Sequence, residues 1–119
     1  MKKENRLTRE KDFLRVKVIG KSYYHPLLVL VYARNDELHS RAAVVASKAI
    51  GNSVTRNRVK RRLKSCLDKL WQKVDKKWDL IFYSRPAIVD ADFDQIYFAI
   101  EYLLLEAGIL GEKNNCNVC

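Results

Sequence analysis

One basic segment organises the chain: Val54-Thr55-Arg56-Asn57-Arg58-Val59-Lys60-Arg61-Arg62-Leu63-Lys64. Six of its eleven residues are Arg or Lys, and none is acidic. Apolar residues recur within and after the segment at helical spacing, at Val59, Leu63, Cys66, Leu67, Leu70 and Trp71. This spacing predicts a helix whose apolar stripe, about 140° wide, lies on a hydrophobic core.

The start of this predicted helix is marked by Gly51-Asn52-Ser53, because Asn and Ser side chains accept hydrogen bonds from the first free N–H groups. On the helical wheel, three cations lie opposite the stripe: Arg58, Arg61 and Arg62. Three others lie beside it: Arg56, Lys60 and Lys64. Cations in a first turn oppose the helix dipole, so folding alone does not favour them there. The segment therefore predicts an anionic partner.

The charge of the chain is unevenly distributed. The net charge of the 119 residues is +9, yet residues 1–85 hold 22 basic and 8 acidic side chains, whereas residues 86–119 hold 1 and 6. A polarised basic chain favours nucleic acid or an anionic membrane surface as its partner. No apolar run reaches the roughly 20 residues that span a bilayer, and the charged start leads into no signal segment. We therefore expect a cytoplasmic protein with no membrane partner.

Length and pattern predict one α+β domain over residues 1–119, ordered over about 5–110. Helices are predicted over about 9–19, capped by Thr8 and ended by Gly20, over the basic segment, and from about 90–94 to Ala107. Strands are predicted at 23–24, 27–34, 40–47 and 78–85, with a hairpin turn at Asn35-Asp36-Glu37. The order is helix, three strands, helix, strand, helix, which is typical of a two-layer sandwich of helices on a mixed sheet.

Residues 41–61 also carry a family resemblance. They read Arg-Ala-Ala-Val-Val-Ala-Ser-Lys-Ala-Ile-Gly-Asn-Ser-Val-Thr-Arg-Asn-Arg-Val-Lys-Arg, which resembles the signature of the protein subunit of bacterial ribonuclease P. Four further segments fall in the family's order, so the resemblance spans about residues 5–108: Arg6-Leu7, Asp12-Phe13, Gly20-Lys21-Ser22 and Arg85-Pro86. Three residues depart from the pattern: Ala43, where Gly is usual, Ala49, where a second Lys is common, and Lys17, where a second aromatic is common.

The resemblance implies a function and a site. Ribonuclease P removes the 5′ leader of precursor transfer RNA, and its catalytic RNA subunit performs the hydrolysis with bound divalent metal ions such as Mg²⁺. The protein subunit would bind that RNA through ten residues: Arg41, Ser47, Lys48, Arg56, Asn57, Arg58, Lys60, Arg61, Arg62 and Lys64. It would bind the leader through four residues: Phe13, Lys17, Val29 and Val31. No catalytic residue, no metal held by the protein and no obligatory protein partner is implied. The family fold also implies a left-handed strand–helix–strand crossover, although most crossovers are right-handed.

Four alternatives to this interpretation stay open. A general structured-RNA-binding protein of the ribosomal type could carry the same basic helix, and a solvated helix face could do so without RNA. Phe13 could be a core residue instead of a stacking surface for a base. The alanines of strand 40–47 could pack closely against a helix or leave a shallow floor for a nucleic-acid strand. A self-sufficient nuclease is not favoured, because no general base is identifiable.

Other reactive side chains have simpler interpretations. Cys66 lies on the apolar stripe and is expected in the core, whereas Cys116 and Cys119 lack the further ligands of a zinc site. His25 and His39 fall in predicted loops with no acidic partner. The acidic residues 90–94 are expected to cap the last helix, since a calcium loop would need Gly where Gln95 stands.

Overall fold

The computed structural model describes residues 3–110 of the chain. The helices are α1 (Glu10–Ile19), α2 (Ser53–Leu70) and α3 (Phe93–Ala107), with short 3-10 helices at Lys3–Asn5, Lys48–Ile50, Trp71–Lys73 and Pro86–Asp90. The strands are β1 (Lys21–Tyr24), β2 (Leu28–Arg34), β3 (Arg41–Val45) and β4 (Trp78–Ser84). The predicted order of helices and strands is confirmed. No helix of the described part combines the length and the apolar character of a membrane span.

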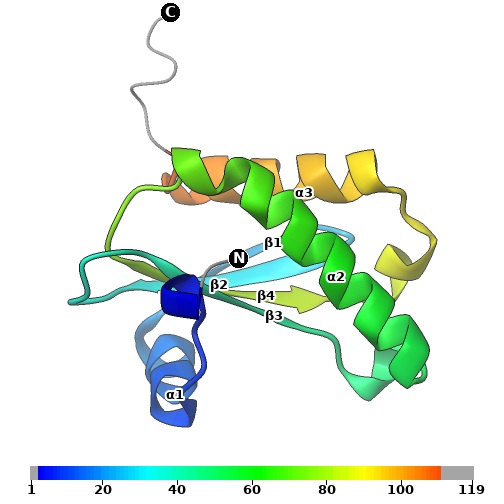
Figure 1. The fold of residues 1–119 in the computed structure, drawn as a ribbon, viewed down its shortest axis with the longest axis horizontal. Coiled ribbons are helices and arrows are strands. Elements are labelled where there is room, and N and C mark those ends of the chain that lie inside the picture. The colour runs from blue at the N-terminus through cyan, green and yellow to red at the C-terminus, as the bar shows by residue number, and fades with distance from the viewer. Residues whose placement is uncertain (1–2, 111–119) are drawn as a thin grey trace, which may run out of the picture.

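The four strands form one mixed sheet in the order β1-β2-β4-β3. β4 pairs antiparallel with β2 and parallel with β3, so β1 and β3 are the two edges of the sheet. Figure 1 shows α2 and α3 together on one face of this sheet and α1 on the other face. The α+β class is confirmed, and α1 adds a partial layer beneath the expected two-layer sandwich.

The predicted hairpin between the second and third strands is wrong, because β4 lies between β2 and β3. Leu80, Ile81 and Phe82 of β4 are fully buried, on both faces of the sheet. A continuous apolar run of this kind is typical of a central strand. β3, whose side chains are smaller, takes the edge instead. Asn35 then begins a connecting loop, in which its side chain accepts a hydrogen bond from the Glu37 N–H at 2.9 Å.

β3, α2 and β4 form the crossover unit that was predicted. In Figure 1 both strands run to the right with β3 nearer the viewer, and α2 returns to the left above them. This path has the left-handed sense that the resemblance implied, against the general preference for right-handed crossovers. As a result, α2 lies diagonally above the β3 edge of the sheet.

α2 begins and packs as predicted. The Asn52 side chain accepts a hydrogen bond from the Thr55 N–H at 2.9 Å and so caps the helix. Five residues of the stripe are buried against α3 and the sheet: Val59, Leu63, Cys66, Leu67 and Leu70. Trp71 is half-buried just past the end of the helix. Burial of each large apolar side chain contributes about 1.5–3 kcal/mol to stability.

The ends of the other two helices follow the sequence with one exception. Asp92 and Gln95 form a capping box at the start of α3, and Asp94 lies in its first turn, so the capping role predicted for these acidic residues is confirmed. α1 is preceded by Arg9, not by Thr8, so the predicted cap is wrong. The reason is that Leu7 donates its N–H to the Ala42 carbonyl oxygen at 2.9 Å, which keeps the preceding chain extended along β3. Gly20 ends α1 as predicted, since a Cβ there would lie only 2.2 Å from the Val16 carbonyl oxygen.

Candidate nucleic-acid interface

The face of the sheet that carries α1 consists of three rows of side chains across β2, β4 and β3. The strand register gives these rows as Ala33–Asp79–Arg41, Val31–Ile81–Ala43 and Val29–Tyr83–Val45. α1 covers the first two, where its buried Val16 packs with Ala33 and Ile81. All three residues of the last row are only half-buried. That row, which we call the open floor, is therefore a shallow surface beside α1.

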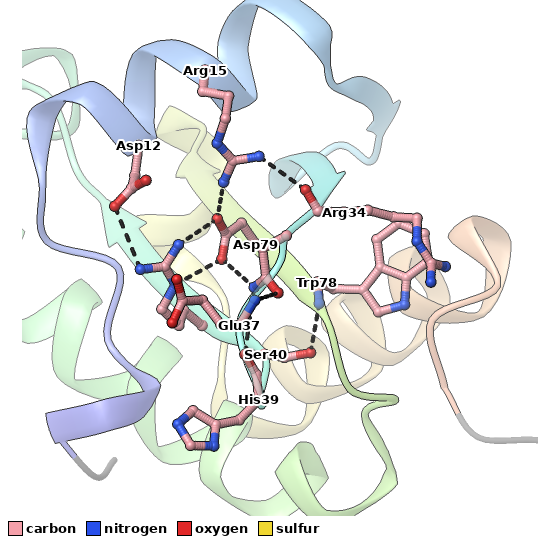
Figure 2. A network of polar contacts seen from close by, with 10 residues as sticks. Asp12, Arg15, Arg34, Glu37, His39, Ser40, Trp78 and Asp79 are labelled. Carbon is pink, nitrogen blue, oxygen red and sulfur yellow. Dashed lines mark hydrogen bonds and ion pairs between the residues drawn. The ribbon is translucent and has the colours of Figure 1, made fainter.

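A buried carboxylate ties α1 to the first row (Figure 2). Asp79 is fully buried and accepts hydrogen bonds from Asn35 Nδ2 at 2.7 Å and from Arg41 Nε and Nη2 at 3.0 and 2.8 Å. Arg15 of α1 forms a further ion pair with Asp79. Because a buried carboxylate is costly unless it is paired and hydrogen-bonded, these three partners offset the burial of Asp79. The network fixes the position of α1, and with it the side chains that α1 holds over the open floor.

The same network gives Arg41 a role that the sequence did not predict. Besides its two hydrogen bonds to Asp79, its guanidinium lies 3.4 Å from Asp12 Oδ2 of α1. The hydrogen bonds to Asp79 raise the pKa of Arg41 above its ordinary value. Only 16% of the side chain is exposed, and it lies on the face away from α2. Arg41 therefore joins β3 to α1 and β4, and the structure does not support it as a contact for an RNA phosphate.

Phe13 and Lys17 lie one turn apart on α1, next to the open floor. Phe13 is half-buried against the cluster beneath α1, as are Val31 and Tyr83. Lys17 is exposed, and its Nζ lies 5.9 Å from the centre of the Tyr83 ring. The structure thus brings together the residues predicted for the leader, since Val29 is the neighbour of Tyr83 in the sheet. Phe13 contributes to packing and still offers part of its surface to a ligand.

A cavity of about 410 Å³ at the β3 edge connects this face with α2. Phe13 lines it from α1, Ala43 from β3, and Lys60 and Lys64 from α2. Arg6 lines it from the N-terminal segment. One aromatic ring and three cations therefore surround a single opening, which the small side chain of Ala43 helps to keep wide. This combination suits the base and the phosphates of a nucleic-acid strand.

The outer surface of α2 forms an exposed basic ridge. Its exposed members are Asn57, Arg58, Arg61 and Lys64, and the exposed Ser47 and Lys48 precede them between β3 and α2. Within residues 3–110, Arg58, Arg61 and Lys64 have no ion pair with a carboxylate. Arg56 and Lys60 are half-buried beside the stripe, as predicted. The ridge therefore presents positive charge that folding leaves uncompensated.

Arg62 does not belong to this ridge. The prediction that it lies opposite the stripe is wrong, because it is half-buried and donates a hydrogen bond to the Ala91 carbonyl oxygen at 3.0 Å. On the wheel, Arg62 adjoins Cys66 on the side of the stripe that faces α3. Its guanidinium thereby satisfies the carbonyl that precedes the α3 cap. Part of its charge is thus used inside the protein.

Two residues of this interface were missed by sequence reasoning. Tyr83 was treated only as part of a strand, although the alternation of β4 puts it on the same face as Asp79 and Ile81. Arg6 was noted only as part of the resemblance, and its place beside the cavity depends on the pairing of its segment with β3. The alternation was a usable signal for Tyr83. No local pattern predicted the pairing at Arg6.

The remaining reactive side chains do not form a site in the described part. Cys66 is buried on the stripe, and burial raises the pKa of its thiol to about 11, so it is protonated at neutral pH. Burial lowers the pKa of His25, whose Nδ1 accepts the Leu27 N–H at 3.0 Å. Residues 3–110 contain no group of three or more His, Cys, Asp or Glu side chains arranged to hold a metal ion. Cys116 and Cys119 lie outside the described residues.

Comparison with known proteins identifies the family. Residues 1–108 match the protein family Ribonuclease P. The chain belongs to this ribonuclease P protein family. A ribonuclease P protein component from Clostridium botulinum (strain Langeland) is 41% identical over 108 residues, which cover 90% of this chain and 97% of the relative. A ribonuclease P protein component from Herpetosiphon aurantiacus is 35% identical, and the match covers 95% of this chain and 92% of that relative.

Solved structures of ribonuclease P proteins share the fold. The Staphylococcus aureus RNase P protein superposes with a TM-score of 0.82 at 26% identity, over 90% of this chain and 98% of its own. A Staphylococcus aureus RNase P protein mutant with defective mRNA degradation activity superposes with a TM-score of 0.84 at 28% identity. The match covers 91% of this chain and 92% of that protein. The Thermotoga maritima RNase P protein superposes with a TM-score of 0.78 over 85% of this chain and 96% of that protein. At 24% identity, this match shows a similar fold alone.

Proposed function

We propose that this chain is the protein subunit of the ribonuclease P ribonucleoprotein, which removes the 5′ leader of precursor transfer RNA in the cytoplasm. The observation that carries the proposal is the exposed ridge of α2, whose cations have no carboxylate partner in the described part of the chain. A solvated helix face usually mixes charges of both signs. An unmixed one suits the phosphates of a large structured RNA.

In this proposal the ridge binds the catalytic RNA subunit. We assign to this RNA contact nine of the ten predicted residues, eight on or beside the ridge and Arg62 on the side of α2 that faces α3: Ser47, Lys48, Arg56, Asn57, Arg58, Lys60, Arg61, Arg62 and Lys64. They would neutralise phosphates and contact 2′-hydroxyls, which is how proteins recognise the shape of RNA helices. Arg62 would contribute least, since its guanidinium already binds a carbonyl oxygen.

The open floor and the cavity at the β3 edge would bind the leader. Phe13 offers a stacking surface for any base, Lys17 a charge, and Val29 and Val31 an apolar floor. Divalent ions such as Mg²⁺ would be bound by the RNA subunit and would activate the water that cleaves the phosphodiester. The protein would hold the leader in register with that centre and raise the affinity for precursor over mature transfer RNA.

A reconstitution assay tests this proposal. Precursor transfer RNA is incubated with Mg²⁺ and the protein alone, a ribonuclease P RNA alone, or both. We expect no cleavage by the protein alone and faster cleavage at low salt with both than with the RNA alone. A messenger RNA substrate in the protein-alone reaction checks for an intrinsic nuclease. Cleavage by the protein after all RNA has been removed would contradict the assignment of the chemistry to RNA.

The salt dependence of RNA binding tests the ridge. If about five cations of α2 each neutralise one phosphate, the slope of log K against log salt should be on the order of −3 to −5. Replacing both Arg58 and Arg61 by Ala should reduce its magnitude by about one to two units. Lys21→Ala with Lys76→Ala removes two exposed charges away from the ridge and serves as the control. An unchanged slope in the Arg58/Arg61 variant would indicate a solvated face.

Replacing Phe13 by Ala separates leader binding from assembly. The change removes a stacking surface but no charge, so affinity for the RNA subunit should stay the same. Affinity for precursor transfer RNA should fall by about 1–3 kcal/mol, the worth of one base–aromatic stack. Mature transfer RNA has no leader and should bind as before, as measured by equilibrium titration. Equal losses for both, together with a lower melting temperature, would make Phe13 a core residue only.

The alternative function is general binding of structured RNA, as in a ribosomal protein. The basic ridge alone is compatible with it. The open floor with Phe13 and Lys17 favours ribonuclease P, because a protein that binds only double helices has no use for a stacking surface. Equal affinity for precursor and mature transfer RNA in the presence of the RNA subunit would favour the alternative.

A further inference from the structure

Tyr83 is the residue of the open floor whose polar group is left without a hydrogen bond in the described part of the chain. It lies in the centre of its row, between Val29 and Val45, on the face that α1 leaves partly open. Its hydroxyl is shielded from solvent and has no hydrogen-bond partner in the described part of the chain. A buried polar atom without a partner is costly, so such atoms in native proteins call for an explanation. The hydroxyl end of the ring is enclosed by the protein, so the ring face beneath Lys17 is the part of Tyr83 that a ligand can contact.

Lys17 is the other half of this arrangement. Its Nζ lies over the Tyr83 ring at 5.9 Å from the centroid, and it has no ion pair with a carboxylate within residues 3–110. An exposed cation over a phenol ring is held only weakly, because water competes for the charge. A phosphate would attract the same ammonium group more strongly than the neutral ring does. The long side chain of Lys17 can therefore leave the ring when an anion is present.

We propose that Tyr83 and Lys17 form a second nucleotide-binding position in the leader cleft, distinct from the stacking surface of Phe13. The ligand is a nucleotide of single-stranded RNA: its base stacks on the Tyr83 ring, and Lys17 moves from that ring to the adjacent phosphate. This inference rests on the proposed function. An aromatic face combined with a mobile cation binds single strands without selecting a sequence. It is therefore suited to leaders of any composition.

The position of the pair supports this assignment. Phe13 and Lys17 lie four residues apart on one side of α1, and Tyr83 lies on the strand beneath. The floor continues past Tyr83 to Val29, whereas the first row of the face is closed by the Asp79 network. A strand of RNA that begins at the cavity of the β3 edge can thus continue over Tyr83 but not under the start of α1. The two aromatic rings would contact different nucleotides.

The test uses the holoenzyme reconstituted with a ribonuclease P RNA, titrated with precursor and with mature transfer RNA. Tyr83→Leu should weaken precursor binding by about 5- to 150-fold, the fold-change of one base stack, and leave mature transfer RNA unchanged. Tyr83→Phe keeps the aromatic ring, so it should bind precursor much more tightly than Tyr83→Leu does. Tyr102→Leu removes an exposed tyrosine from α3, on the other face of the sheet, and should bind like the wild type.

Lys17→Ala provides a variant at an exposed position, which keeps the test valid if Tyr83→Leu does not fold. It should lower the magnitude of the salt slope for precursor by about 0.7, the value for one phosphate of a single strand, and leave the slope for mature transfer RNA unchanged. A precursor affinity of Tyr83→Leu equal to that of the wild type, or an unchanged slope in Lys17→Ala, would overturn the inference. If instead the wild-type holoenzyme does not prefer precursor over mature transfer RNA, the proposed function itself fails.

Discussion

Asp79→Ala is expected to lower the free energy of unfolding by about 3 kcal/mol or more, the cost of leaving one member of a buried ion pair without its partner. Asp79 is fully buried and is shared by Arg15, Arg41 and Asn35. Among the described residues, its removal leaves the Arg41 guanidinium with the 3.4 Å contact to Asp12 alone, in a site where 16% of the Arg41 side chain is exposed. Urea denaturation, followed by tryptophan fluorescence, measures the loss.

Two further variants make this result specific. Asp12→Ala removes a carboxylate from the same guanidinium, but at the longer distance of 3.4 Å and with Asp79 still in place, so it should cost clearly less than Asp79→Ala. Asp79→Asn keeps the shape of the side chain and removes the charge, so its loss should lie between those of the other two variants. If Asp79→Ala were no less stable than Asp12→Ala, the network would not be what fixes α1 to the sheet.

Leu63→Ala is expected to cost about 2–5 kcal/mol of stability, the range for buried leucines truncated to Ala. Leu63 is fully buried in the middle of the α2 stripe, where it packs with the core of α3 and the sheet. Ala is as good a helix former as Leu, so the loss reports packing and not helix propensity.

Leu105→Ala is the matched control, because Leu105 lies on α3 with 57% of its surface exposed. This substitution should lower the free energy of unfolding by less than about half a kcal/mol. Thermal and urea unfolding of both variants give the comparison. A small loss for Leu63→Ala would mean that the stripe faces a partner instead of the core. The orientation of the basic ridge would then have to be reversed.

The elements that local pattern specifies were predicted correctly. The stripe from Val59 to Leu70 is buried as expected, because helical periodicity depends only on neighbours a few residues away. Asn52, Asp92 and Gly108 mark helix ends through hydrogen bonds and backbone geometry that are equally local. The grouping of Phe13 with Lys17 came from the family resemblance, and their spacing of four residues puts both on one side of α1.

What the sequence could not supply were pairings between distant segments. The hairpin at Asn35 was a reasonable local prediction, yet the sheet gains more by burying the apolar β4 on both faces than by pairing β2 with β3. Arg41 looked like part of the basic run, and only the fold brings Asp79, 38 positions away, to its guanidinium. Arg62 was misplaced for a similar reason, since its partner Ala91 belongs to a segment 29 positions further along the chain.

The central place of β4 also determines when this protein can fold during its synthesis. β4 is the last strand within residues 3–110, and Arg34 of β2 lies opposite Trp78, 44 positions later. Until residue 84 has left the ribosome, β2 and β3 have no common neighbour, and only the short hairpin of β1 with β2 can form. The apolar stripe of α2 likewise has no complete sheet to cover at that stage. Because such distant pairings form slowly, a nascent chain of this protein exposes its strands and its α2 stripe until β4 has been synthesised and released.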